Sequence, residues 1–600
     1  MSMIVDRREL DFVLFEFLGV ERLLGHPRFQ AYDRAAIQQM LDVGQKIAEQ
    51  KFLPIAAEVD ANEPVIVDGR IKVPAGVGAA LSDYAQAGFF ALPFAEDIGG
   101  LQAPWFLHTV ITGMFSCANT AVSNYAFLTI AAANLLNAFG SDALRQTFLR
   151  PMLEGRWFGT MCLSEPQAGS SLGDITTTAT EGADGLYRIR GSKMWISGGD
   201  QEISENIVHM VLAKIPGGPA GTKGISLFLV PKRRVNPDGT AGASNNIALA
   251  GLNHKMGQRG TTNCLLNFGE EGECLGFLIG ERHRGIEYMF HMMNEARIGV
   301  GHASTMAALG GFLHSAEYAR TRTQGRRPDQ KNPASPQVPI IEHADIRRML
   351  LAQKAATEGA QALCLYCATL VDELATLENG EEKEWKRSLL GLLTPVVKSW
   401  PSEHCLEANK WAIQILGGYG YTRDFPLERF YRDNRLNHIH EGTFGIQGMD
   451  LLGRKVAGDR GETLERFAGT MRETVAAALA VERLEPDARQ LGDCLDALTQ
   501  TTRALLACED QLLRLANATI YLDAFGHIVV GWIWLQQALA AADALARNDL
   551  SDADRSFYEG KIVTARYFSR YELPHSITRL ALCQSLETTC LDAPVEIFGA

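Results

Sequence analysis

The sequence lacks the features that mark several large classes of protein. Its 600 residues carry a net charge of −13, which argues against nucleic acid as a main partner, because phosphate binding needs clustered Lys and Arg. The N-terminus has no uninterrupted apolar stretch of the kind that makes a signal peptide. The most apolar window, residues 526–546, is broken by Gln536, Gln537 and Asp543, so we expect a buried helix there and no membrane span.

Cysteine and metal-ligand patterns are also sparse. The eleven cysteines are too scattered for a disulfide framework and suit a reducing compartment, so we expect a cytoplasmic protein. Cys364 and Cys367 form a CxxC, but no second pair lies at zinc spacing and the surrounding pattern is helical. His438 and His440 lie two residues apart without nearby partners, so we expect no metal site.

The sequence lacks the common nucleotide-binding loops and consists of successive helical and strand-rich segments. No GxGxxG follows a strand and there is no GxxxxGK[ST], which makes Rossmann and P-loop folds poor interpretations. The pattern predicts a mainly α protein with a central β domain. Its predicted parts are a helical extension over 1–34, helices over 35–158, strands over 159–285, helices over 286–458 with a loop at 324–339, and further helices over 459–600.

One short stretch, "IHEGTFGIQ" at 439–447, raises a chemical question, because Glu441 follows a largely apolar helical region. Read alone, this carboxylate could simply cap the next helix. Other motifs precede it in order: "MCLSEPQAGSSLGDITTTA" (161–179), "GSKMWISGG" (191–199), "KMGQRGTTNCLLNF" (255–268), "ARIGVG" (296–301) and "QILGGYGYTRDFPLERFYRD" (414–433).

Together these motifs resemble the acyl-CoA dehydrogenase family, over about residues 35–458. The N-terminal extension and the extra C-terminal helices resemble the longer bacterial branch of that family, which includes 3-methylmercaptopropionyl-CoA dehydrogenase and related fatty acyl-CoA dehydrogenases. The resemblance implies a helical domain, a β-barrel or sandwich domain and a helical bundle, with an added C-terminal helical domain. It also implies FAD-dependent dehydrogenation of an acyl-CoA thioester to a trans-2-enoyl-CoA, with the β-hydride passing to flavin N5.

In the family the catalytic base is the Glu of an [IV]-x-E-G-T segment, which here is Glu441, and Gly442 leaves room for the substrate. An apolar neighbourhood would raise the pKa of this carboxyl toward the working range of a base. Some relatives take the base from a Glu directly before the Arg of the "ARIGVG" region. That place is Ala296 here, and Glu295 lies one residue earlier, rotated by about 100° on a helix. Glu295 therefore stays as the alternative base.

The resemblance also assigns flavin contacts in the strand region. Met161, Leu163 and Ser164 would line the isoalloxazine, while Gly169 and Ser170 would approach the pyrophosphate or the pantetheine of the substrate; a plain polar turn is the alternative for this stretch. Further cofactor contacts are expected from Trp195 over the ring face, Ile196, Ser197 at N5, and Thr443. Taken alone, Trp195 would more often be a core aromatic.

Other implied contacts involve CoA and a neighbouring subunit. Asn294 and Arg297 correspond to substrate-binding positions, with a helix-surface ion pair in the neighbourhood of Glu295 as the alternative role for Arg297. The family's FAD contacts from a second subunit fall on Arg322, Gln414, Gly417 and Gly418, which implies a homo-oligomer, most simply a dimer. The sequence departs from the family pattern at three positions that bear on the adenine contacts and the acyl pocket: no Phe follows Arg322, His440 stands where many relatives have Tyr, and Gly445 replaces a common Gln.

Two other functions remain open within the same superfamily. An acyl-CoA oxidase would pass electrons to O₂, whereas the resemblance favours a dehydrogenase served by electron-transferring flavoprotein. Certain relatives bind DNA through a basic C-terminal domain, but residues 459–600 hold 21 acidic and 13 basic side chains. Only one of the basic residues is a lysine, Lys561, which also disfavours a membrane-surface role. We expect this region to be a helical bundle docked on the catalytic body, with its tryptophans Trp532 and Trp534 buried.

Overall fold

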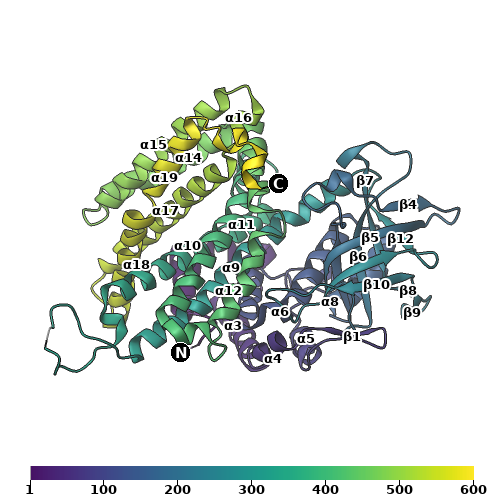
Figure 1. Ribbon diagram of the computed structural model, residues 1–600, viewed down its shortest axis with the longest axis horizontal. Helices are drawn as coiled ribbons and strands as arrows, with labels where there is room; N and C mark the ends of the chain where they lie inside the picture. The colour runs from purple at the N-terminus through teal and green to yellow at the C-terminus, as the bar shows by residue number, and fades with distance from the viewer. Residues whose placement is uncertain (1, 331, 600) are drawn as a thin grey trace. The chain divides into compact units, whose positions relative to one another are not determined.

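The computed structural model describes residues 2–330 and 332–599, including all of their side chains except those of 291–294. The chain forms two compact units. Residues 27–296 make the unit that contains the large β-sheet, here called the sheet unit; residues 1–26 and 297–600 make the helical unit. The prediction of a mainly α protein with a central β domain is confirmed (Figure 1).

The sheet unit begins with helices that surround one long apolar helix, α6 (Trp105–Phe139). A kink at Asn119 interrupts α6, and the Asn119 amide there donates to the carbonyl of Phe52 at 3.3 Å. The rings of Phe52 and Tyr84 each pack edge to face against Phe115 of α6 and are tilted relative to one another. These three side chains give the region an aromatic core. The other helices are α3 (Arg34–Ile47), α4 (Ala56–Ala61), α5 (Val77–Gln86), α7 (Asp142–Leu144) and α8 (Arg150–Leu153).

A small hairpin interrupts the region that the sequence pattern predicts to be helical. Strands β1 (Val65–Val67) and β2 (Arg70–Lys72) pair antiparallel across Asp68 and Gly69, both at positive φ. An Asp-Gly pair between alternating segments is a strong signal for a two-residue hairpin turn. The surrounding Ala- and Leu-rich helices hide so short a signal.

The sheet has eight strands within the described residues, in the order β10-β11-β5-β12-β7-β6-β3, with β4 paired to β5. Strands β6 and β7 are apolar and buried on both faces, as expected for central strands. The pairings are antiparallel except that β6 runs parallel to β3 and, at one residue pair, to β4. The strands are β3 (Trp157–Cys162), β4 (Thr178–Glu181), β5 (Tyr187–Ser197), β6 (Asn206–Lys214), β7 (Ile225–Pro231), β10 (Ile247–Leu252), β11 (Asn263–Phe268) and β12 (Leu275–Ile279). A separate pair is β8 (Arg233–Val235) and β9 (Ala241–Ser244).

The helical unit is built on the later part of α9 (Gly285–Thr321) and on the helix pair α10 (Ala344–Thr376) and α11 (Glu381–Leu416). The predicted loop at 324–339 is confirmed over its described residues, between α9 and a 3₁₀ turn that begins at Ile340. After α11 the chain forms α12 (Leu427–Arg435), α13 (Phe444–Met449) and the π-helical segment η11 (Asp450–Val456). The segment between α12 and α13 contains Glu441.

The C-terminal helices are docked on α10 and α11, as the sequence predicts. The central one, α17 (Ala518–Leu545), is the one described helix long and apolar enough to cross a membrane, yet 67% of its most apolar window is buried in the protein. Trp534 on α17 donates to the carbonyl of Ala355 at 3.0 Å, and Trp532 meets Tyr366 edge to face. Around α17 lie α14 (Glu462–Leu479), α15 (Glu485–Ala507), α18 (Asp552–Tyr567) and α19 (His575–Gln584).

A buried ion network ties both ends of the chain to α10. Lys561 of α18 contacts Glu9 of α1 (Arg7–Asp11) at 2.5 Å and Glu358 of α10 at 3.0 Å. The same ammonium lies 4.9 Å from the ring centroid of Phe12 and 4.8 Å from that of Trp534. The one lysine of residues 459–600 is therefore inside the protein and cannot serve a membrane surface.

Candidate active site

Glu441 lies in a strained turn between α12 and α13. It has a φ of +53°, and Gly442 after it has a φ of +89°. A left-handed conformation at a non-glycine residue costs about 1–3 kcal/mol and persists only where the surroundings enforce it. A Cβ at Gly442 would lie 2.6 Å from Nε2 of Gln447, so any larger residue would be strained by the positive φ and would also have to displace this amide.

Two side chains hold the carbonyls of this turn. Gln447 Nε2 donates to the carbonyl of Glu441 at 3.0 Å, and Lys398 Nζ donates to that of Gly442 at 2.8 Å. The helix that follows is capped by Thr443, whose hydroxyl accepts from the N–H of Ile446. Glu441 is therefore not the cap of α13, and no described residue forms a hydrogen bond or ion pair with its carboxylate. The cofactor contact expected of Thr443 stays a prediction.

The carboxyl of Glu441 faces two cations. Burial raises the pKa of Glu441 above its ordinary value, while Arg297 and Lys398 act in the opposite direction. Arg297 is buried and pairs with buried Asp450 at 3.0 Å. Arg297 therefore forms an ion pair, but it is a buried pair with Asp450 and differs from the helix-surface pair near Glu295 that is the alternative from the sequence; the contact of Arg297 with CoA stays a prediction. Asn294, the other predicted substrate contact, has a side chain outside the described residues.

The alternative base has its carboxylate engaged elsewhere. Glu295 accepts a short hydrogen bond from the side-chain amide of Asn134 on α6, within the sheet unit. Burial raises the pKa of Glu295 to about 7, and Asn134 opposes the shift. A carboxyl with such a pKa could act as a base on chemical grounds, so the choice between Glu295 and Glu441 depends on position.

In the sheet unit, the predicted flavin contacts gather where the end of β3 meets β5. The N–H of Met194 donates to the carbonyl of Ser164 at 3.0 Å, which brings Ser164 beside the Met194–Trp195 segment, with Leu163 next to it and Met161 on β3. Trp195 has a φ of +66° and is 59% exposed, so it is not a core aromatic. Ile196 is buried in the sheet, and Ser197 Oγ accepts from Asn263 at 3.1 Å.

A buried ion pair that the sequence pattern did not reveal fixes this corner. Lys193 Nζ contacts Glu165 at 2.9 Å and donates to the carbonyl of Leu163 at 2.9 Å. Glu165 also accepts from the N–H and hydroxyl groups of Thr176 and Thr177. Burial alone would raise the pKa of Glu165, but Lys193 and these donors hold it at about 2. The pair thereby anchors the "SEPQAGS" loop (164–170), in which Gly169 and Ser170 are exposed.

Lys193→Met should destabilise the protein by about 3–5 kcal/mol, because it leaves the Glu165 carboxylate buried without its cation. We expect a lower melting temperature and weaker FAD retention, since the Leu163 carbonyl loses its tie to β5. Arg190→Met, at an exposed position of the same strand, is the matched control and should change neither value. Unchanged melting of Lys193→Met would show that the pair does not hold this corner.

The residues expected to reach a second subunit lie on the surface of the helical unit. An apolar cluster joins the ends of α9 and α11 through residues that include Ala319 and Leu416. Beyond this cluster Gly417 has a φ of +58°, and nothing lies within 4 Å of a Cβ added at Gly417 or Gly418. Arg322 and Gln414 are exposed at the same helix ends. These backbone and side-chain donors are accessible, and their partner stays a prediction.

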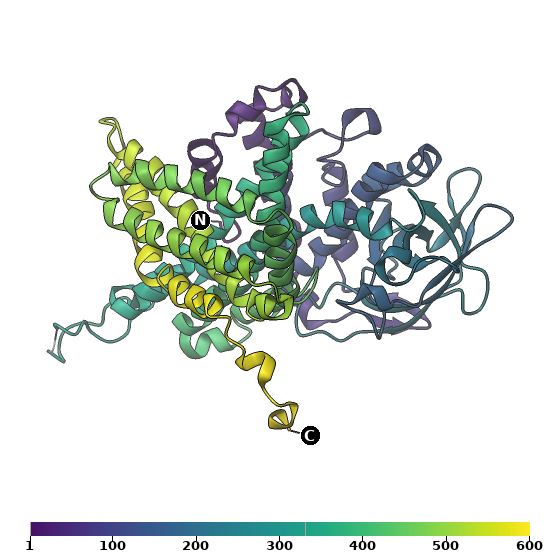
Figure 2. The ribbon, with the colours of Figure 1, turned by 90° about the horizontal axis from the view of Figure 1, so that it is seen from above.

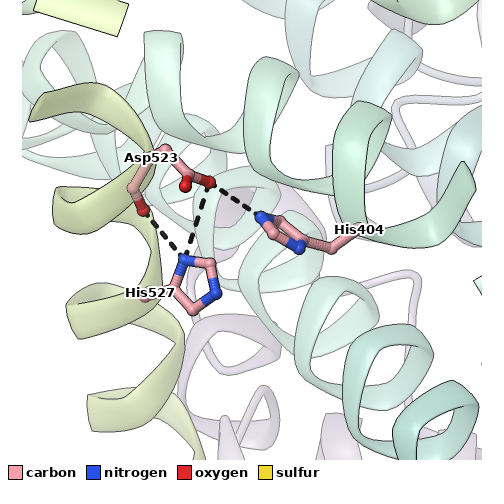
Figure 3. A group of neighbouring side chains, drawn as sticks. All are labelled: His404, Asp523 and His527. Carbon is pink, nitrogen blue, oxygen red and sulfur yellow. Dashed lines mark hydrogen bonds and ion pairs between the residues drawn. The ribbon is translucent and has the colours of Figure 1, made fainter. Parts of the chain in front are cut away.

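A second polar cluster, His404, Asp523 and His527, joins α11 to α17 (Figure 3). His404 Nε2 lies 2.8 Å from Asp523 Oδ1, and Arg579 of α19 lies 2.8 Å from the other oxygen. His527 Nδ1 lies 2.9 Å from the backbone carbonyl of Asp523, which can only accept a hydrogen bond. Trp400 Nε1 also lies 3.3 Å from His527 Nδ1, so the polar atoms of the cluster contact side chains of α11, α17 and α19, and we interpret the cluster as a docking contact between these helices.

Family models match the chain in succession. The matches are the acyl-CoA dehydrogenase N-terminal domain over residues 35–156, its middle domain over 160–270 and its C-terminal domain over 283–456. The acetyl-CoA dehydrogenase C-terminal like domain matches residues 467–594. These matches define the class of protein, a flavin-dependent oxidoreductase of acyl-CoA thioesters.

Similar proteins cover nearly the whole chain. It is 33% identical to the broad-specificity linear acyl-CoA dehydrogenase of Mycobacterium tuberculosis over 98% of each chain. It is 34% identical to the 3-methylmercaptopropionyl-CoA dehydrogenase of Ruegeria pomeroyi over 93% of this chain and 94% of that one, and 32% identical to a butyryl-CoA dehydrogenase of Syntrophomonas wolfei over 98% of each. The chain belongs to the acyl-CoA dehydrogenase family, as the motifs predict, and is an FAD-dependent enzyme.

Solved structures agree in fold. ACDH-11 of Caenorhabditis elegans, in complex with C11-CoA, has a TM-score of 0.75 at 18% identity and covers 97% of this chain and 94% of its own. An acyl-CoA dehydrogenase of Bacillus anthracis complexed with FAD has a TM-score of 0.73 at 18% identity over 94% and 90%. Both matches include the extra C-terminal helices.

The residues present fit FAD. Trp195 offers an exposed aromatic face in a conformation that the sheet has to enforce, and the hydroxyls of Ser164 and Ser197 lie on the same corner as hydrogen-bonding groups. Exposed indole surface of this kind is typical of a ligand-covered position. The open backbone at Gly417 and Gly418 suits the close approach of a phosphate.

Proposed function

We propose that Glu441 removes the α-proton of an acyl-CoA thioester to begin its conversion to a trans-2-enoyl-CoA. The observation that carries the proposal is a carboxylate in a left-handed turn, with its capping role taken by Thr443 and its carbonyl held by Gln447. A thioester α-proton is weakly acidic, so its removal needs a positioned base whose pKa is raised toward neutrality. Burial acts on Glu441 in that direction.

When bound, FAD accepts the hydride that leaves Cβ. The remaining work belongs to the protein. Gly442 has no side chain to block the approach of the acyl chain to Glu441, and the N–H of Glu441 is a candidate donor to the thioester carbonyl as negative charge develops there. Trp195 and Ser197 are proposed to position the flavin ring. Arg297 is proposed to stabilise the ionised form of the Glu441 carboxylate by its positive charge.

We propose an unbranched acyl chain as the substrate. The relatives that match over the full length are named for linear acyl, butyryl and 3-methylmercaptopropionyl thioesters, all of them unbranched at Cα. A relative named for isobutyryl-CoA matches only 70% of the chain, at 25% identity. An extra methyl group changes binding in an apolar pocket by about 1–3 kcal/mol, enough to separate the two classes.

The purified protein should be yellow and should bleach when mixed without oxygen with butyryl-, octanoyl- or 3-methylmercaptopropionyl-CoA. Isobutyryl-CoA is the matched control for butyryl-CoA and should bleach it at least about tenfold more slowly. A panel read by flavin absorbance settles the substrate class. A protein that carries FAD and is bleached by none of these thioesters would overturn the proposed function.

The proposed electron acceptor is electron-transferring flavoprotein, and the proposed location is the cytoplasm. An oxidase would instead be reoxidised by O₂ within its catalytic cycle. We expect the reduced enzyme to reoxidise slowly in air and quickly with electron-transferring flavoprotein, which single-turnover reoxidation would measure.

We further propose a homodimer in which Arg322, Gln414, Gly417 and Gly418 meet the FAD of the partner. Their exposure on the helical unit supports this, as does the exposed aromatic surface of Tyr419 and Tyr421 beside them. Mass measurement in solution tests the oligomeric state.

A further inference from the structure

Lys398 is a buried cation that no motif of the base segment includes. It lies fully buried on α11, and its ammonium donates to the carbonyl of Gly442 at 2.8 Å. Among the described residues, this carbonyl is the one hydrogen-bond partner of the Lys398 ammonium. No described carboxylate oxygen lies within 4.0 Å of it, the distance that defines an ion pair. A buried ammonium without a contacting anion is costly and needs a reason.

The helix packing fixes where Lys398 points. A Cβ at Gly301 of α9 would lie 1.9 Å from the carbonyl of Val397, so the backbones of α9 and α11 approach closely at this level. Pro401 has no N–H to occupy that carbonyl, and Ser304 of α9 donates to the carbonyl of Pro401 at 3.0 Å. The backbone of α11 on either side of Lys398 is thereby fixed against α9, and the hydrogen bond to the Gly442 carbonyl gives the long side chain a fixed position.

We propose that Lys398 is a positioning residue for the reaction: it holds the strained Glu441–Gly442 turn through the Gly442 carbonyl and supplies the charge that keeps the Glu441 carboxylate ionised. This inference rests on the proposed role of Glu441 as the base. Lys398 touches neither the substrate nor the flavin in this scheme, and it acts through Glu441.

The other charges around Glu441 do not replace Lys398. Arg297 also faces Glu441, but it contacts an anion of its own, Asp450, at 3.0 Å, which it shares with Arg454 at 2.7 Å. Burial, and next the Lys398 charge, lower the pKa of His440 to about 3, so this neighbour is neutral at working pH. Lys398 is thus the cation near the base that has no other anion. The further charged groups that face Arg297 and Asp450 in this cluster are Arg454 and Lys455.

The charge states of Lys398 and Glu441 determine in which direction the pH dependence of the reaction should change. Burial lowers the pKa of Lys398 to about 7, and Glu441 acts against that shift. Below that pH the ammonium is present and lowers the pKa of Glu441; without it, burial would leave the Glu441 carboxyl protonated to higher pH. The pH–rate profile of flavin reduction should therefore change on its acidic side, here called the acid limb. When the charge of Lys398 is removed, the pH at which the rate falls off should rise by about 1–3 units, for a cation this close.

The test is the rate of anaerobic flavin bleaching at saturating butyryl-CoA, measured across pH for the holoenzyme. Lys398→Met and Lys398→Gln both remove the charge, and Gln keeps an N–H donor. Both should move the acid limb upward by about 1–3 units. Lys398→Arg keeps a cation and should keep the limb near its wild-type position. Lys410→Met, an exposed lysine of α11 paired with Glu407, is the matched control and should leave the profile unchanged.

The experiment distinguishes a failure of the role proposed for Lys398 from a failure of the role proposed for Glu441. FAD content and melting temperature show that each variant is folded, and Lys398→Gln serves where Lys398→Met fails to fold. A rate that falls equally at every pH with no movement of the limb would make Lys398 merely structural and overturn this inference. If Glu441→Gln keeps the wild-type rate, the proposed function itself fails, whatever the Lys398 variants do.

Discussion

Glu441→Gln is expected to retain FAD and bind acyl-CoA, yet to reduce the flavin about 10²–10⁴-fold more slowly than the wild type. The amide has nearly the same shape as the carboxylate, and the ties that hold this turn are to backbone carbonyls, so the turn should persist. What is lost is the group that accepts the α-proton. An effect on the reduction rate without an effect on binding is the signature of an interaction made only in the transition state.

Stopped-flow bleaching and acyl-CoA titration measure the two quantities separately. Glu407→Gln, on the exposed side of α11, is a matched control for the chemical change and should reduce the flavin at the wild-type rate. A Glu441→Gln protein that has lost its FAD would point to a structural role of the carboxylate and would contradict its proposed role as the base.

Truncation after Gly458 has the second large expected effect, loss of the folded protein. It removes the helices that cover α10 and α11, including the Trp534 contact with Ala355. It also strips Lys561 from Glu9 and Glu358, and breaking a buried pair alone costs about 3–5 kcal/mol. That is a large share of the roughly 5–15 kcal/mol that stabilises a typical domain.

A shorter truncation is the control. Residues 589–599 form two short helical turns, α20 (Thr589–Asp592) and η13 (Val595–Phe598), that extend from the body of the helical unit and are largely exposed (Figure 2). Removal of residues 589–600 keeps the hydrogen bond from Asn517 to the carbonyl of Glu587 and should leave melting temperature and activity intact. Size-exclusion chromatography and thermal melting compare the two proteins. A folded, active enzyme that ends at Gly458 would refute the structural role of the C-terminal helices.

The sequence was informative where a signal is local. Alternation and apolar runs predicted strands such as β6 and β7, and the C-terminal helices followed from their periodicity. The segment around Glu441 was recognisable because its Glu, Gly and Thr lie together. The hairpin β1–β2 was missed since its signal spans only eight residues within helical surroundings.

Contacts between distant residues were beyond the reach of sequence patterns. Lys193 and Glu165 each lie in a motif, but nothing in the spacing shows that they pair across β5 and the loop after β3. Arg297 and Asp450 are 153 residues apart, and Lys398 reaches Gly442 over 44 residues. These pairings depend on the close approach of helices and strands, which no single motif encodes.

The most direct test of Glu441 as the base is exchange of the α-hydrogens of bound butyryl-CoA with deuterium from the solvent. Exchange reports proton removal itself and needs no net transfer of hydride. The wild type and Glu295→Gln, whose carboxylate is held by Asn134, should both exchange the α-hydrogens, and Glu441→Gln should not. Exchange that persists in Glu441→Gln and is lost in Glu295→Gln would contradict the role proposed for Glu441 and assign the base to Glu295.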